Sequence, residues 1–175
     1  MKKNLFIVFI TVAAICFGHQ AKAQVKPTAT SGPVTVNINL TDAISITLGA
    51  DPTVNFDYLT AADYAASKTV TKASHFTVIS NKPYNLSVTA MGTFQPAGGP
   101  DLDIVTVNVP ASTANGGTPV PNVPLSTTAS ALVNGSTASK GAIYTVEYTI
   151  SDPASLLNLT GSTYNTTVTY TATQQ

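Results

Sequence analysis

Charged residues are scarce in this sequence, and their kinds exclude one class of partner. Only 9% of the 175 residues are charged, and all eight basic residues are lysine because the chain contains no arginine. Binding to a nucleic-acid backbone depends on clustered basic side chains. The lysines are scattered and form no basic cluster, so nucleic acid is not expected as a partner.

The side chains that most often carry catalysis are also few. The chain has one cysteine, Cys16, and two histidines, His19 and His75, and it has no tryptophan. A zinc site needs several Cys or His ligands, and a nucleophile needs a neighbouring base. We find no such motif, so no enzyme, catalytic residue or cofactor is expected. His75 is expected to face water or a sheet edge.

The first 23 residues have the parts of a secretory signal peptide. Lys2 and Lys3 precede an apolar run over residues 5–18, and the small residues Ala21 and Ala23 follow it. Cleavage is expected before Gln24. The apolar run is too short for a good membrane span, which takes about 20 residues. The chain is therefore expected to be exported to the periplasm, cell surface or extracellular space, with no transmembrane segment after cleavage.

Alternation of apolar and polar residues is the main structural signal in the rest of the chain. Threonine and valine, which favour strands, are frequent there. Period-two alternation predicts strands, and Gly, Pro and Asn between them predict turns. The pattern predicts an all-β chain folded as an antiparallel immunoglobulin-like β-sandwich. The expected strands are 34–40, 44–48, 70–80, 84–90, 104–109, 144–150 and 164–172.

The chain after the signal peptide has 152 residues, the usual size of one domain. Residues 1–23 are assigned to the signal peptide, 24–33 to a mobile leader and 34–175 to a single sandwich domain. Asn81-Lys82-Pro83 predicts a hairpin, residues 60–67 predict one helical turn, and 111–124 predict a long loop. The apolar phase of the strands gives the expected core: Val36, Ile38, Ile46, Leu86, Val88, Val146, Tyr148, Val168 and Tyr170.

Two pairs of residues are the candidates for ligand binding. Asp101 and Asp103 follow a glycine-rich turn, and two loop carboxylates with nearby carbonyls are a calcium-binding arrangement. A solvated loop is the favoured interpretation of this pair, because two acidic side chains alone do not define a calcium site, and calcium binding is the alternative. Tyr58 and Tyr64 flank the alanine-rich segment, outside the predicted strands. They are the rings expected to be exposed and to face a ligand such as a glycan.

Three segments resemble secreted bacterial β-sandwiches. They are VTVNINLTDAISITL (34–48), HFTVISNKPYNLSVTA (75–90) and GSTYNTTVTYTATQQ (161–175). Their order is similar to that of spore-coat-protein-U-like and fimbrial-subunit-like domains and of WxL-type surface domains. The Trp-x-Leu motif is replaced by Tyr170-Thr171-Ala172, so the resemblance implies the sandwich and not the peptidoglycan-binding role. Similar fimbrial domains assemble by lending a strand to a neighbour.

These observations favour an exported, non-enzymatic surface or fimbria-like protein with a structural or adhesive role. Its expected partners are other copies of itself or other surface or fimbrial subunits, joined by strand pairing. Residues 34–40 are the better candidate for a donated strand, and the last strand is the other. A glycan- or cell-wall-binding module is the first alternative, and an enzyme is the second.

The signal peptide gives a first prediction. Exported protein should begin at Gln24, because the small residues that a signal peptidase requires end at Ala23. Intact-mass measurement of the exported chain tests this. A mass that includes residues 1–23, or one that includes lipid attached to Cys16, would contradict the prediction.

Overall fold

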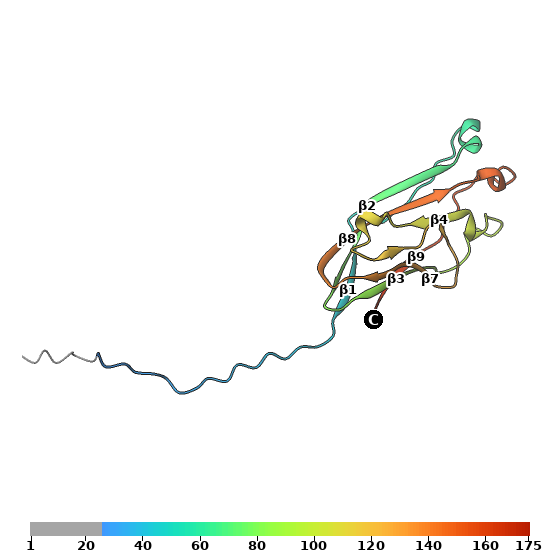
Figure 1. Cartoon of the computed structure of the whole chain (residues 1–175). Helices are drawn as coiled ribbons and strands as arrows, with labels where there is room; N and C mark the ends of the chain where they lie inside the picture. The colour runs from blue at the N-terminus through green and yellow to red at the C-terminus, as the bar shows by residue number, and fades with distance from the viewer. Residues whose placement is uncertain (1–25) are drawn as a thin grey trace, which may run out of the picture. The chain divides into compact units, whose positions relative to one another are not determined.

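Two antiparallel sheets form the folded part of the chain, as seen in the computed structural model (Figure 1), which describes residues 26–175. The expected signal peptide lies outside the described residues. The compact unit is Asn39–Gln175. Its strands are β1 (Ile44–Leu48), β2 (Lys68–Ser80), β3 (Tyr84–Ala90), β4 (Val105–Asn108), β5 (Thr118–Pro119), β6 (Val123–Pro124), β7 (Ser130–Ser136), β8 (Ser139–Ile150) and β9 (Val168–Gln174). Its 3-10 turns are η1 (Ala61–Ala65), η2 (Leu102–Ile104), η3 (Ala111–Thr113) and η4 (Pro153–Leu156).

The strand order defines a β-sandwich. One sheet has the order β1-β2-β8-β4-β6, and the other has the order β5-β7-β3-β9. All the pairs of neighbouring strands are antiparallel. The predicted all-β fold is therefore confirmed, and so is the single helical turn, which is η1.

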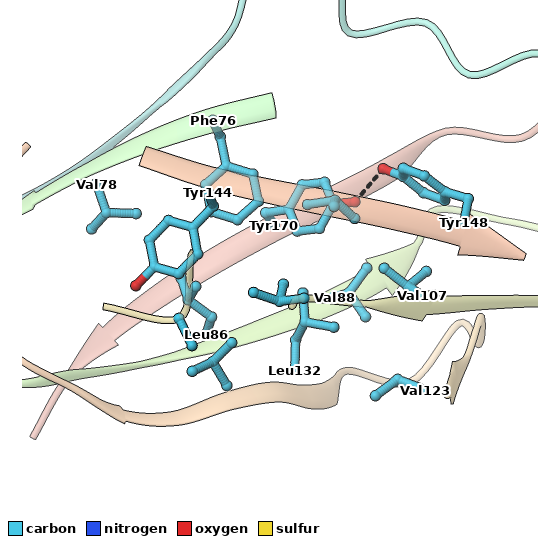
Figure 2. Close-up of a cluster of buried hydrophobic side chains, with 14 of the residues drawn as sticks. Phe76, Val78, Leu86, Val88, Val107, Val123, Leu132, Tyr144, Tyr148 and Tyr170 are labelled. Atoms are coloured by element: carbon cyan, nitrogen blue, oxygen red, sulfur yellow. Dashed lines mark hydrogen bonds between the residues drawn. The ribbon is translucent and has the colours of Figure 1, made fainter. Parts of the chain in front are cut away.

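The core lies between the two sheets, as Figure 2 shows for the side chains that face one another across it. Phe76, Val78 and Tyr144 project from β2 and β8 toward Leu86 on β3 and Leu132 on β7, and all five are at most 1% exposed. Period-two alternation in β3 and β8 turns one face inward and leaves the other at the surface. Of the predicted core, these are confirmed as buried: Leu86, Val88, Val146, Tyr148 and Tyr170.

Residues 34–40 are the largest departure from the expected core. The structure has no strand between residues 26 and 43, and Val36 and Ile38 are each 80% exposed. The prediction that these two residues are buried is therefore wrong. Ile46 and Val168 are only half-buried. All four residues alternate as core residues do, but an apolar surface that would cover them is missing from the described part of the chain.

The turn at Asn81-Lys82-Pro83 does not close a hairpin. It connects β2 in one sheet with β3 in the other, so the chain crosses the sandwich at this point. Ser80 ends β2 facing inward and Tyr84 begins β3 facing inward, at 1% and 0% exposure. The residues on both sides of the turn thus face the core although the chain changes sheets. A short linker between such residues has the same sequence pattern in a hairpin as in a crossing between sheets.

Strand β7 was not predicted, because it contains a turn signal. Asn134-Gly135 lies within β7, where Gly135 has a φ of +69°. The register between β3 and β7 shifts here, and the Gly135 N–H donates to Asn85 Oδ1 at 2.8 Å. A glycine with positive φ marks a bulge in this case. The predicted loop 111–124 also contains η3 and the short strands β5 and β6.

No helix among residues 26–175 is long and apolar enough to cross a membrane.

The core gives a stability prediction. Leu86→Ala should lower the free energy of unfolding by about 2–5 kcal/mol, because it empties a site that is 1% exposed. Thr171→Ala, on the exposed face of the neighbouring strand β9, should change it by less than about 0.5 kcal/mol. Urea unfolding curves test the pair, and equal losses would show that the inward faces are misassigned.

Candidate functional site

A groove runs between β1 and β9, which are edge strands of different sheets. It has a volume of about 360 Å³ and is lined by Ile46, Leu48, Thr167, Val168, Thr169 and Tyr170. Within the described residues, β1 pairs only with β2, and β9 pairs only with β3. One side of each strand therefore has backbone groups without a neighbouring strand. Such an edge is a template for pairing with another segment.

The side chains in the groove are apolar but incompletely covered. Leu48 is 55% exposed, and Ile46 and Val168 are half-buried although they pack against the core. Core positions of the neighbouring strands, such as Val78 and Val88, are at most 1% exposed. The open seam between β1 and β9 is thus the place where the apolar interior reaches the surface.

One end of the groove is fixed by hydrogen bonds. Asn81 Oδ1 accepts from the Ala43 N–H at 3.0 Å, and the Ala43 carbonyl accepts from the Asn81 N–H at 3.2 Å. Gln174 Nε2, at the end of β9, donates to the same carbonyl at 2.9 Å. Lys82 pairs with Asp42 at 2.7 Å. The chain just before β1 is therefore held against the β2–β3 turn and the end of β9.

Hydrogen bonds connect Tyr170 in the groove lining to two side chains beneath it, Tyr148 and His75. Tyr170, which lines the groove, hydrogen-bonds through its hydroxyl to the Tyr148 hydroxyl, the dashed line in Figure 2. His75 Nε2 lies 2.8 Å from the Tyr148 hydroxyl. Both tyrosine rings meet the His75 ring edge-on, with centroids 5.7 and 5.6 Å away. Burial raises the pKa of Tyr148 to about 12 and also raises that of Tyr170.

His75 is buried at 3% exposure, so the expectation that it faces water is wrong. The cause is an irregularity in β2, where the register with β8 shifts between Lys72 and Phe76. Ser74 has a φ of +52° at this point. The shift turns two successive residues, His75 and Phe76, inward. Alternation alone cannot reveal such a bulge, and His75 was therefore missed as a residue of the site.

The 34–40 segment has an alternating pattern of apolar residues whose side chains are exposed. Val34, Val36, Ile38 and Leu40 are 81%, 80%, 80% and 85% exposed. In an extended chain these four side chains lie on one face, because successive residues point to opposite sides. The segment was predicted as a strand, and in the structure it has no strand partner among the described residues.

Asp101 and Asp103 are both exposed and lie at the start of η2. Among residues 26–175, no group of three or more His, Cys, Asp or Glu side chains is placed to hold a metal ion. The structure therefore brings no further carboxylate or imidazole to this pair.

Tyr58 and Tyr64 lie together, but neither is exposed. Both are half-buried, and their ring centroids are 5.0 Å apart. Lys68 Nζ lies 4.7 Å from the centre of the Tyr58 ring and 2.7 Å from Asp63 Oδ1. The Lys68 and Thr60 hydrogen bonds hold the pKa of Asp63 well below its usual range. Both rings are thus partly covered within the protein, and their role toward a ligand stays a prediction.

Comparison of the sequence with models of known protein families gives no match, and comparison with curated proteins gives no significant match.

The backbone beside His75 gives a prediction for the site. Gly49 donates its N–H to the His75 carbonyl at 2.8 Å, and a Cβ on Gly49 would lie 2.4 Å from the Ser74 carbonyl oxygen. Gly49→Ala should lower the free energy of unfolding by about 1–3 kcal/mol, because backbone must shift. Gly161→Ala, where nothing lies within 4 Å, is the control. Equal denaturation midpoints for the two variants would contradict this packing.

Proposed function

We propose that the protein is an exported, non-enzymatic structural subunit of a surface or fimbria-like assembly. In this assembly the 34–40 segment of one copy fills the groove between β1 and β9 of another copy. The observation that supports the proposal is the match between two incomplete parts of the same chain. The segment has the alternating pattern of a strand but no strand partner among the described residues, and the groove is an apolar seam between two edge strands.

Binding of the segment in the groove would cover the exposed apolar side chains of both. Its four apolar side chains are 80–85% exposed in the free chain, and burial is worth roughly 1.5–3 kcal/mol for each such side chain. The backbone of the incoming strand would also pair with an edge strand, as in other cases of strand addition. The half-buried Ile46 and Val168 would then be covered as ordinary core residues are.

The hydrogen bonds before β1 favour binding between copies over binding within one copy. For the 34–40 segment to fold back along its own β1, the chain would have to reverse at residues 41–43. Those residues are tied to Asn81 by three hydrogen bonds, including Asn81 Nδ2 to the Thr41 carbonyl at 2.8 Å. The Asp42–Lys82 ion pair lies just beyond the last paired residues of β1 and β2, Ile44 and Ser80. A reversal would break these contacts.

The resemblance to fimbrial-subunit-like domains supports the same function, because similar domains lend a strand to a neighbour. The present sandwich has the components for such an exchange in its own sequence: an alternating segment ahead of β1 and an edge strand β9 that ends one residue before Gln175. The segment and β9 are also the two strands that the sequence pattern favours for exchange.

The proposal predicts that only one face of the 34–40 segment controls assembly. Val36→Thr with Ile38→Thr, in the chain that begins at Gln24, should abolish polymers, because the apolar face is lost while a strand-forming residue is retained. Asn37→Thr with Asn39→Thr changes the opposite face and should assemble as the unaltered chain does. Size-exclusion chromatography with light scattering, and electron microscopy, measure the polymers.

The monomer fold provides the control. Val36 and Ile38 are 80% exposed, so the unfolding midpoint of the monomer should be the same in both double variants. Equal assembly of the two variants would contradict the proposal. An unaltered chain that stays monomeric at millimolar concentration would contradict it as well.

A further inference from the structure

We propose that strand binding in the β1–β9 groove is weakened by acid, with His75 as the group that senses the pH. This inference rests on the proposed function, since it concerns the same groove. It depends on where His75 lies: beneath the groove, connected through Tyr148 to Tyr170, which forms part of the groove lining.

The surroundings of His75 suit a neutral imidazole. Nε2 has the Tyr148 hydroxyl as its partner, while Nδ1 is buried and has no hydrogen-bond partner. Protonation would place a charged N–H at Nδ1 where no acceptor is available. Burying an unpaired charge is costly. The neighbouring hydroxyls do not supply a negative charge, because the pKa values of Tyr148 and Tyr170 lie far above the range in which imidazole titrates.

The charged groups near His75 come from two elements. Lys72 precedes it on β2, and Asp51 lies in the loop after β1; their side chains form an ion pair at 2.6 Å. Tyr148 on β8 and Tyr170 on β9 complete the titratable groups that face the ring. Burial lowers the pKa of His75, Lys72 lowers it further, and Asp51 opposes them. The neutral ring is therefore favoured in the folded protein.

A bound strand would strengthen this preference. Tyr170 is 8% exposed and is the contact between the groove and the buried ring. A strand in the groove would remove the remaining water from this side, so the pKa of His75 should be lower in the bound state than in the free state. By reciprocity, protonation of His75 must weaken binding by the same factor. The affinity of the groove for the strand is highest at pH values above the pKa that His75 has in the free protein. The affinity falls as the pH drops through that pKa.

The stability of the fold should also decrease as the pH falls. The pKa of His75 is lower in the folded chain than its ordinary value of about 6.5. The stability that the neutral ring contributes is therefore complete above about pH 6.5, and it decreases as the pH falls below that value. This effect is separate from binding and is measurable without any strand exchange.

The experiment uses the chain from Gln24 with Val36→Thr and Ile38→Thr, so that its own segment does not compete, and a peptide of residues 33–41 as the probe. His75 is the one histidine after residue 23, so its imidazole signals in an NMR titration are unambiguous. Peptide should lower the pKa of His75. Peptide affinity should be lower at pH 4.5 than at pH 7.5, and the fold-change should match the factor by which bound peptide changes the acid dissociation constant of His75.

Two variants test the assignment. His75→Gln keeps a donor for Tyr148 but cannot titrate, so peptide affinity should become independent of pH over this range. Lys72→Gln removes the nearby cation and leaves Asp51, so the loss of affinity should begin at a higher pH. The second variant changes a partly exposed ion pair, and it gives a result even where His75→Gln fails to fold.

The outcomes separate the two proposals. Peptide binding with the same pH dependence in His75→Gln, or with no change in the pKa of His75, overturns this inference and leaves strand exchange intact. The inference is also overturned if peptide affinity begins to fall at the same pH with and without the Lys72→Gln substitution. Failure of the peptide to bind at any pH overturns the proposed function and this inference together.

Discussion

The open seam between β1 and β9 is the constraint on which the rest of the account depends. An antiparallel sandwich covers its apolar interior only where the two sheets are closed against each other. Here the first and last strands are both edges, and Ile46, Leu48 and Val168 remain partly exposed between them. The same chain has an alternating apolar segment at residues 34–40 that is almost fully exposed. These two observations are the basis of the proposed strand exchange.

Specific contacts hold the backbone around the seam. Ala43 is held by Asn81 and Gln174, so the chain just before β1 is fixed against the β2–β3 turn and the end of β9. A bulge in β2 places His75 under the groove instead of at the surface, and Gly49 fits against the backbone of that bulge. The groove is therefore a preformed feature, and preformed sites lose less entropy when a strand binds.

Alternation in the sequence predicts the faces of the sandwich well, because a period of two follows directly from strand geometry. Leu86 and Val146 are buried as their phase requires. The same rule fails for Val36 and Ile38, which are each 80% exposed, since it indicates which side chains suit an apolar surface and not whether the fold supplies one. Local patterns also cannot reveal the β2 bulge that buries His75, or the crossing between sheets at residues 81–83. Gly135 is a turn signal in the sequence, but it lies inside β7 at a bulge, which the local pattern also cannot reveal.

Cysteine crosslinking tests strand exchange most directly, because the chain from Gln24 contains no cysteine. Ile38→Cys is placed in one set of copies and Leu48→Cys, in the groove, in another, and a short bismaleimide joins thiols that lie close together. Strand exchange between copies predicts mixed covalent dimers when the two variants are combined, and covalent ladders when one chain carries both substitutions. If the chain with both substitutions gives only internally crosslinked monomers and the mixture gives no mixed dimers, the segment binds its own groove and the account is contradicted.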